Sequence, residues 1–112
     1  MSVQHKELAA GRWCQMPFVE QMANIGSEVE RALTWRSKNN PSYSGQASER
    51  ALELIDLTLE AAKTFPQRRE VARVREAFVD YFYGANSFAS TEVSWKKYFV
   101  HFAYAARRSR GI

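Results

Sequence analysis

Apolar side chains recur at every third or fourth position early in the chain, and this spacing constrains the fold more than any other feature. Between residues 17 and 38 these positions are Phe18, Met22, Ile25, Val29, Ala32 and Leu33. The spacing places them along one face of an α-helix. It therefore predicts an amphipathic helix starting at Pro17, whose missing N–H is tolerated in a first helical turn.

Three further segments have the same helical character. Residues 44–65 have an apolar arc covering more than half of the helix circumference, residues 66–83 have a narrower stripe, and residues 91–108 end in a basic stretch. A helix as apolar as 44–65 needs cover on two sides, which fits either the centre of a bundle or an oligomer interface. Gly26 lies inside the first helix at a cost of about 1 kcal/mol relative to Ala. It marks either a close helix–helix contact or a tolerated defect.

Helices joined by short connections favour antiparallel neighbours. We expect an all-α fold: an up-down-up-down four-helix bundle over residues 17–110, preceded by an N-terminal arm, residues 1–16, that carries Trp13 across it. A chain of 112 residues is long enough for one such core. No apolar run approaches the roughly 20 residues that cross a bilayer, the N-terminus does not resemble a secretory signal, and one cysteine, Cys14, excludes an internal disulfide framework. We therefore expect a cytoplasmic protein without a membrane partner.

Positive charge is concentrated in the second half of the chain. Residues 1–56 have a net charge of −1 and residues 57–112 a net charge of +5, within a total of +4. On a helical wheel of residues 91–108, one face holds Trp95, Phe99, Phe102 and Ala106. The opposite face holds Lys97, His101, Tyr104 and Arg108, which we call the basic stripe, and Arg107 adds charge at the end of the segment.

Two interpretations of this charge stay open. A solvated basic face that complements the partial negative charge of a helix C-terminus is the simpler one. The other is a surface that binds phosphates, with Tyr104 stacking on a base. Arg69 and Arg73 form a second basic cluster on the third of the four segments, where we expect Glu76 and Asp80 of the same face to pair with them.

The sequence shows no pattern typical of catalysis. The two histidines are not in Glu-x-x-His pairs of the di-iron type, Cys14 has no second thiol for a zinc site, and there is neither a phosphate-binding glycine loop nor the Arg-x4–6-His motif of some helical ribonucleases. We therefore expect no metal, no cofactor and no catalytic residue. The sequence does offer candidates for a protein–protein interface, because Trp is enriched at such interfaces. The candidates for contact with a second copy are Trp35, Leu54 and Leu57.

The length, the four helices, the basic balance and the basic ending "AARRSRGI" resemble small bacterial four-helix-bundle proteins. This loose group includes ribosomal-intervening-sequence proteins and accessory proteins of reverse transcriptases. The resemblance is one of architecture, and it implies a homo-oligomer, ring-shaped in some cases, that binds a protein–RNA partner. No functional residue transfers from it.

Three hypotheses follow. The first is a non-catalytic accessory or adaptor bundle that self-associates and binds RNA, DNA or a nucleoprotein through Lys97, His101, Tyr104, Arg107, Arg108, Arg69 and Arg73. The second is a purely protein-binding or structural homo-oligomer, in which the charge serves solubility. The third is an enzyme, which would need a pocket where polar groups converge.

Overall fold

The computed structural model describes residues 6–109, with side chains from residue 11 onward, and this part of the chain is helical with no strand. The prediction of an all-α fold is confirmed. The helices are α1 (Lys6–Gln15), α2 (Phe18–Ser37), α3 (Pro41–Ala61), α4 (Phe65–Tyr83) and α5 (Glu92–Ser109). Residues 1–5 of the predicted arm and residue 110, the predicted end of the bundle, lie outside the described residues.

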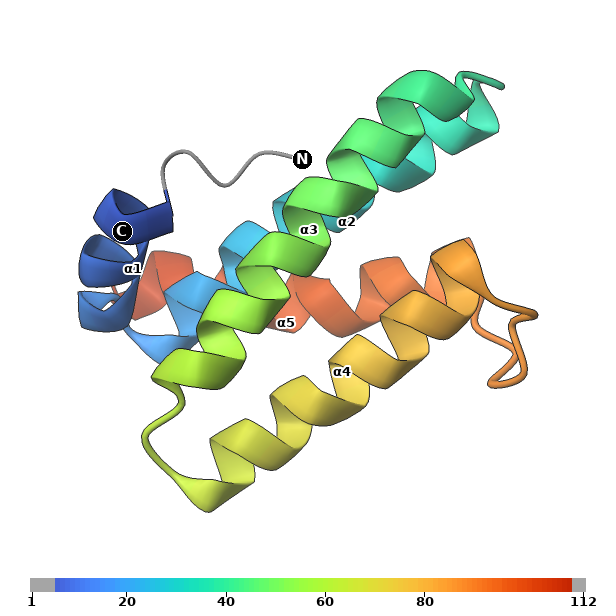
Figure 1. The fold of residues 1–112 in the computed structure, drawn as a ribbon. Helices are drawn as coiled ribbons and strands as arrows, with labels where there is room; N and C mark the ends of the chain where they lie inside the picture. The colour runs from blue at the N-terminus through green and yellow to red at the C-terminus, as the bar shows by residue number, and fades with distance from the viewer. Residues whose placement is uncertain (1–5, 110–112) are drawn as a thin grey trace.

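The predicted arm contains a helix, α1, that packs against α3. Trp13 is buried, and its indole N–H donates a hydrogen bond to the Thr58 hydroxyl across 2.9 Å. The Gln21 amide donates to the Trp13 carbonyl oxygen across 2.7 Å, which ties the end of α1 to the start of α2. The tryptophan thus anchors α1, which lies at one end of the long helices, as Figure 1 shows at the blue end of the chain.

Local capping residues set where the later helices begin. Asn40 accepts a hydrogen bond from the Tyr43 N–H and Pro41 occupies the first turn, so α3 begins three residues before the predicted Ser44. Thr64 caps α4 by accepting from the Gln67 N–H. At α5 the pair is reciprocal: the Thr91 hydroxyl accepts from the Ser94 N–H and the Ser94 hydroxyl from the Thr91 N–H.

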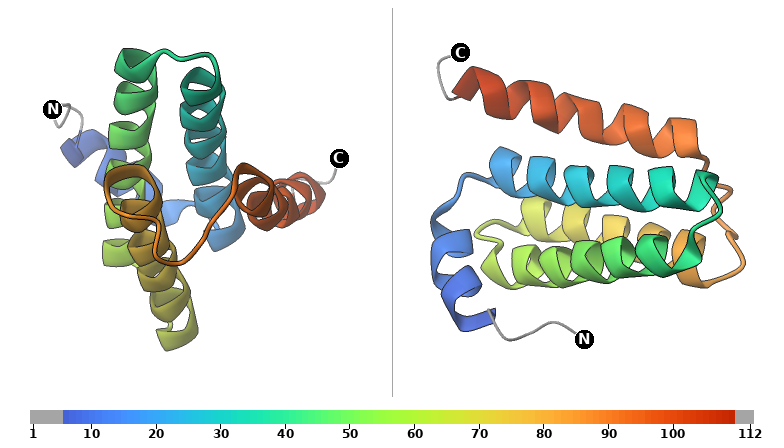
Figure 2. Two further views of the ribbon diagram at one scale, coloured as in Figure 1. Left: turned by 90° about the vertical axis from the view of Figure 1, so that its right-hand side faces the viewer. Right: turned by 90° about the horizontal axis from the view of Figure 1, so that it is seen from above.

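The four long helices pack side by side in the order α5, α2, α3, α4. The helices α2 and α3 form an antiparallel hairpin, with α5 packed beside α2 and α4 beside α3. In the right-hand view of Figure 2 the chain reverses direction from each long helix to the next, while the left-hand view shows α4 and α5 diverging from each other. A regular up-down-up-down bundle is therefore not confirmed, because the two outer helices do not pack along each other.

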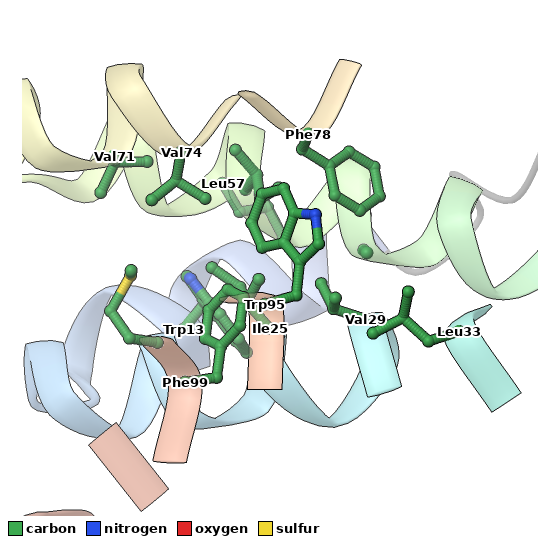
Figure 3. Packing of buried hydrophobic residues seen from close by; sticks show 13 residues of the cluster. Trp13, Ile25, Val29, Leu33, Leu57, Val71, Val74, Phe78, Trp95 and Phe99 are labelled. Carbon is green, nitrogen blue, oxygen red and sulfur yellow. The ribbon is translucent and has the colours of Figure 1, made fainter. Parts of the chain in front are cut away.

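The core lies between these four helices. It combines aliphatic residues of α2 and α3, such as Ile25 and Ile55, with the aromatic rings of Phe78, Trp95 and Phe99. Phe78 and Trp95 meet edge to face with 6.2 Å between ring centroids. Figure 3 shows the Trp95 indole nitrogen on the side of the Phe78 ring. Large rings thus occupy the inner part of the space between the diverging helices α4 and α5.

The helix α3 is covered on several sides. It packs against α2, against α4 and, through Trp13 and Thr58, against α1. Its wide apolar arc is accordingly used within the chain, as expected for the centre of a bundle. Leu57 is buried in this core, whereas Leu54 is half-buried against it.

Candidate functional site

The two faces predicted for the last helix are observed on α5. Trp95, Phe99 and Ala106 are buried and Phe102 is half-buried. On the opposite side the residues of the basic stripe, Lys97, His101, Tyr104 and Arg108, are exposed. The Arg108 guanidinium lies 5.7 Å from the centroid of the Tyr104 ring, so the two exposed side chains form a cation–π contact.

Arg107 is exposed as well, but it lies on another flank of α5. One residue corresponds to about 100° of rotation around a helix. Arg107 therefore points away from Arg108 and towards the side of Val100. It adds to the positive potential of α5 without lengthening the basic stripe.

The cations of the basic stripe, Lys97 and Arg108, form no ion pair with a carboxylate of the described residues. Within residues 11–109 the ion pairs are Arg31–Glu28, Arg50–Glu28, Arg75–Asp56 and Lys96–Glu92. The pairing expected for Arg69 and Arg73 on α4 is not found among them. Asp80, which we expected to share their face as a partner, accepts hydrogen bonds from the Ser87 and Phe88 N–H groups at 2.8 and 3.0 Å.

Arg69 and Arg73 instead line a cleft between α4 and α5, which we call the α4–α5 cleft. It encloses about 620 Å³, a size typical of small-molecule sites. Its lining residues are Pro66, Arg69, Glu70, Arg73, Val74, Ala77, Ser90, Ser94, Trp95 and Tyr98. The cleft thus combines cations, hydroxyl groups, apolar side chains and aromatic rings.

One hydrogen bond joins the two helices across the cleft. The Tyr98 hydroxyl of α5 donates to Oε2 of Glu70 on α4 across 2.5 Å. Burial of the phenol, the hydrogen bond to Glu70 and the charge of that carboxylate raise the pKa of Tyr98 above its ordinary value of 10.0. Tyr98 therefore stays a neutral donor at physiological pH and holds the Glu70 carboxylate against α5.

The connection between α4 and α5 holds the cleft open at one end. Besides the bonds to Asp80, the Asn86 side chain accepts from the Ser90 N–H at 2.9 Å and donates to the Ser90 carbonyl at 3.0 Å. Asn86 and Ala89 both have positive φ angles, of 57° and 56°. A loop held in this way fixes the position of Ser90, which lines the cleft, and so fixes where α5 starts relative to α4.

The sequence singled out only part of this site. It identified Arg69 and Arg73, but Glu70, Tyr98, Ser90 and Trp95 were not recognised as residues that face them. The one available signal was Tyr98, a polar-tipped aromatic at the edge of the apolar face of α5. The remaining residues come together through the angle between α4 and α5, which residue spacing does not encode.

The candidate interface residues lie apart from this cleft. Trp35 is half-buried and meets Tyr43 edge to face at 4.8 Å between centroids, with the Lys38 ammonium 5.3 Å from its ring. Leu57 contributes to the chain's own core and is only 5% exposed. Trp35 and Leu54 are half-buried and expose more of their side chains.

The α4–α5 cleft offers cations, hydroxyl groups and aromatic rings to a ligand. No cluster of His, Cys, Asp and Glu suited to a metal ion occurs in residues 11–109, and the lining of the α4–α5 cleft includes neither a histidine nor a cysteine. In the described part of the chain, no helix has the length and apolar character needed to span a bilayer. Cations beside apolar and aromatic surface suit a ligand that is both anionic and planar.

The chain matches no family model, no curated protein and no solved structure.

Proposed function

We propose that this chain is a non-catalytic helical adaptor that binds nucleic acid through α4 and α5, acting in the cytoplasm and as a homo-oligomer. The observation that supports this most is a set of cations on these two helices that form no ion pair within residues 11–109: Lys97, Arg107, Arg108, Arg69 and Arg73. Unpaired Lys and Arg side chains are free to neutralise phosphates and to release counterions. Tyr104 beside Arg108 adds a ring on which a base can stack.

The arrangement of the helices supports the same proposal. We infer that the long helices α2 to α5 form an antiparallel bundle of which the outer members, α4 and α5, diverge. The divergence leaves Arg69 and Arg73 on one side of the α4–α5 cleft and α5, with its basic stripe, on the other. A nucleic-acid strand crossing the two helices would meet cations from both.

Salt dependence tests the proposal. Fluorescence anisotropy of labelled single-stranded RNA and DNA, at about 50 and 200 mM salt, should show affinity that falls steeply as salt rises. The double variant Lys97→Gln/Arg108→Gln should lower the slope of log affinity against log salt by about 1.4, from a value of about 0.7 per phosphate contact. Its melting curve should not change, because both side chains are exposed.

A matched variant controls for total charge. Arg12→Gln/Lys38→Gln also removes one Arg and one Lys from exposed positions, but on α1 and after α2. It should retain the salt slope of the unmodified chain. An equal loss in both variants, or no binding at the lower salt, would contradict the proposal.

A protein-binding or oligomeric role is the second candidate. It is favoured by exposed apolar side chains on the outer face of α5, where Val93 and Val100 are 68% and 57% exposed. If this face joins two copies, analytical ultracentrifugation should show a dimer or larger species, and Val93→Asp/Val100→Asp should yield a monomer. A monomer at all accessible concentrations would exclude the oligomeric form.

A further inference from the structure

We infer that the α4–α5 cleft receives one unstacked base of a single-stranded nucleic acid, while Arg69 and Arg73 contact the phosphates beside it. This inference rests on the proposed function and names the form of nucleic acid that the site would take. A base inside a duplex is paired and stacked, so only a single strand can place one in a cleft without breaking pairs.

The size and the lining of the cleft support a base as the occupant. Its volume of about 620 Å³ accommodates a planar ring system. Trp95 and Tyr98 supply aromatic surface on the α5 side, and Val74 and Ala77 supply apolar surface on the α4 side. Bases bind between aromatic and apolar side chains of this kind with little regard to sequence, since each base has an aromatic face.

The polar groups of the cleft are placed to contact both the phosphate and the base of a nucleotide. Arg69 and Arg73 are one helical turn apart on α4, are both exposed and form no ion pair within residues 11–109. Guanidinium groups match phosphate geometry well. Glu70 lies between them in sequence, and while Oε2 accepts from Tyr98, its other oxygen has no hydrogen-bond donor among the described residues. That oxygen can accept from the amino group of cytosine, a pairing seen in base recognition.

The cleft does not need to be created by the ligand. The hydrogen bonds from Ser87 and Phe88 to Asp80, and from Ser90 to Asn86, hold the α4–α5 connection in place. The Tyr98–Glu70 bond holds the helices at a second point. A site that is ordered before binding loses less entropy when the base enters.

An abasic oligonucleotide separates the base from the phosphates. The probe is labelled oligodeoxycytidylate of about 12 nucleotides, compared with an abasic strand of the same length and charge. With the unmodified chain, we expect the abasic strand to bind about tenfold more weakly or worse, given the affinity that one stacked base contributes. Both strands should still show salt-dependent binding, because both have phosphates.

Filling the cleft should reduce this difference. Ala77→Leu fills it from α4, and Ser90→Leu fills it from the other side without removing a protein hydrogen bond of the Ser90 side chain within the described residues. In either variant the difference in affinity between the two strands should shrink markedly, and what remains is the stacking of a base on Tyr104. Ala72→Leu, the same substitution at an exposed position of α4 outside the cleft, should keep the full difference.

The outcomes separate the two proposals. If the abasic strand binds the unmodified chain as tightly as oligodeoxycytidylate, or if both folded cleft variants keep the difference, the base does not enter the cleft, although nucleic-acid binding stands. If neither strand binds at low salt, the proposed function is wrong and the inference falls with it. Melting curves of both cleft variants establish that they are folded. The two substituted side chains enter the cleft from opposite sides, so if one variant misfolds, the other still tests the inference.

Discussion

Gly26 lets α2 and α5 approach more closely than a residue with a side chain would. A Cβ atom built at this position would lie 2.8 Å from Cβ of Phe99 and 2.9 Å from two atoms of its ring. Real Cβ atoms do not approach carbon that closely, so Phe99 or the helix backbone would have to shift. Of the two explanations that the sequence allowed for this glycine, a close helix–helix contact is the one observed.

We therefore expect Gly26→Ala to destabilise the fold by about 1–3 kcal/mol, as overpacked cores do, despite the better helix propensity of Ala. Gly45 provides the control, because it lies inside α3 with no atom within 4 Å of a built Cβ. Gly45→Ala should stabilise the chain by about 0.5–1 kcal/mol. Urea unfolding measures both, and a stabilised Gly26→Ala variant would show that the α2–α5 contact is looser than described.

Tyr98 gives stability a dependence on alkaline pH. Its folded-state pKa is raised, chiefly by burial and then by the bond to Glu70. The unfolded chain releases this proton near pH 10, whereas the folded chain retains it. The contribution of Tyr98 is therefore fully present below about pH 10 and is lost as the pH rises above that value.

Tyr98→Phe should remove this part of the pH dependence. We expect the free energy of unfolding of the unmodified chain to fall between about pH 9 and pH 11 more steeply than that of the variant. At neutral pH the variant should be less stable by roughly 1 kcal/mol, the usual value of one hydrogen bond. Urea unfolding at several pH values provides the comparison, and parallel pH profiles would contradict the assignment of Tyr98 as a buried donor.

Among the helices, periodicity predicted those whose apolar residues face one neighbour. The first predicted segment, 17–38, differs from α2 by one residue at each end. The last predicted segment, 91–108, begins at Thr91, whose hydroxyl caps α5 by accepting from the Ser94 N–H. For α3, the signal that was missed lay just upstream, since Asn40 and Pro41 begin the helix before its apolar pattern starts.

The helix α1 escaped prediction for a different reason. Its sequence KELAAGRWCQ has no continuous apolar stripe, so periodicity gives no signal. Among its described side chains, Trp13 ties it to the core, and the partner Thr58 lies 45 residues away in the sequence. A short helix stabilised by long-range packing cannot be inferred from local pattern, because most of its stability comes from tertiary contacts.

Like the position of α1, the shape of the α4–α5 cleft depends on packing between helices and not on local sequence pattern. The faces of α4 and α5 follow from residue spacing, and Arg69 and Arg73 were assigned to the surface on that basis. Whether the two helices close against each other or diverge depends on how Phe78, Trp95 and Phe99 fill the space between them. The opening that faces Arg69 and Arg73 is a result of that packing, and the sequence alone predicted its cations but not its shape.

Across the whole molecule, burial is concentrated in one helix pair. Seven buried residues come from α2 and seven from α3, against three each from α4 and α5. We therefore expect the α2–α3 hairpin to be the most stable part of the fold, with the helices that bear the proposed site on its outside. Such a distribution leaves the binding helices freer to adjust than the hairpin that supports them.

Hydrogen exchange under native conditions tests this distribution. We expect the backbone amides of α2 and α3 to exchange only through global unfolding, because their release exposes the whole core. The amides of α4 should exchange sooner, since α4 packs along α3 but is separated from α5 by the cleft. Those of α5 should lie between, because the contact of Phe99 with Gly26 holds α5 close to α2. Mass spectrometry of proteolytic fragments resolves the three groups, and α4 protection equal to that of α2 would mean that the chain opens as a single unit, in which α4 cannot move without loss of the core.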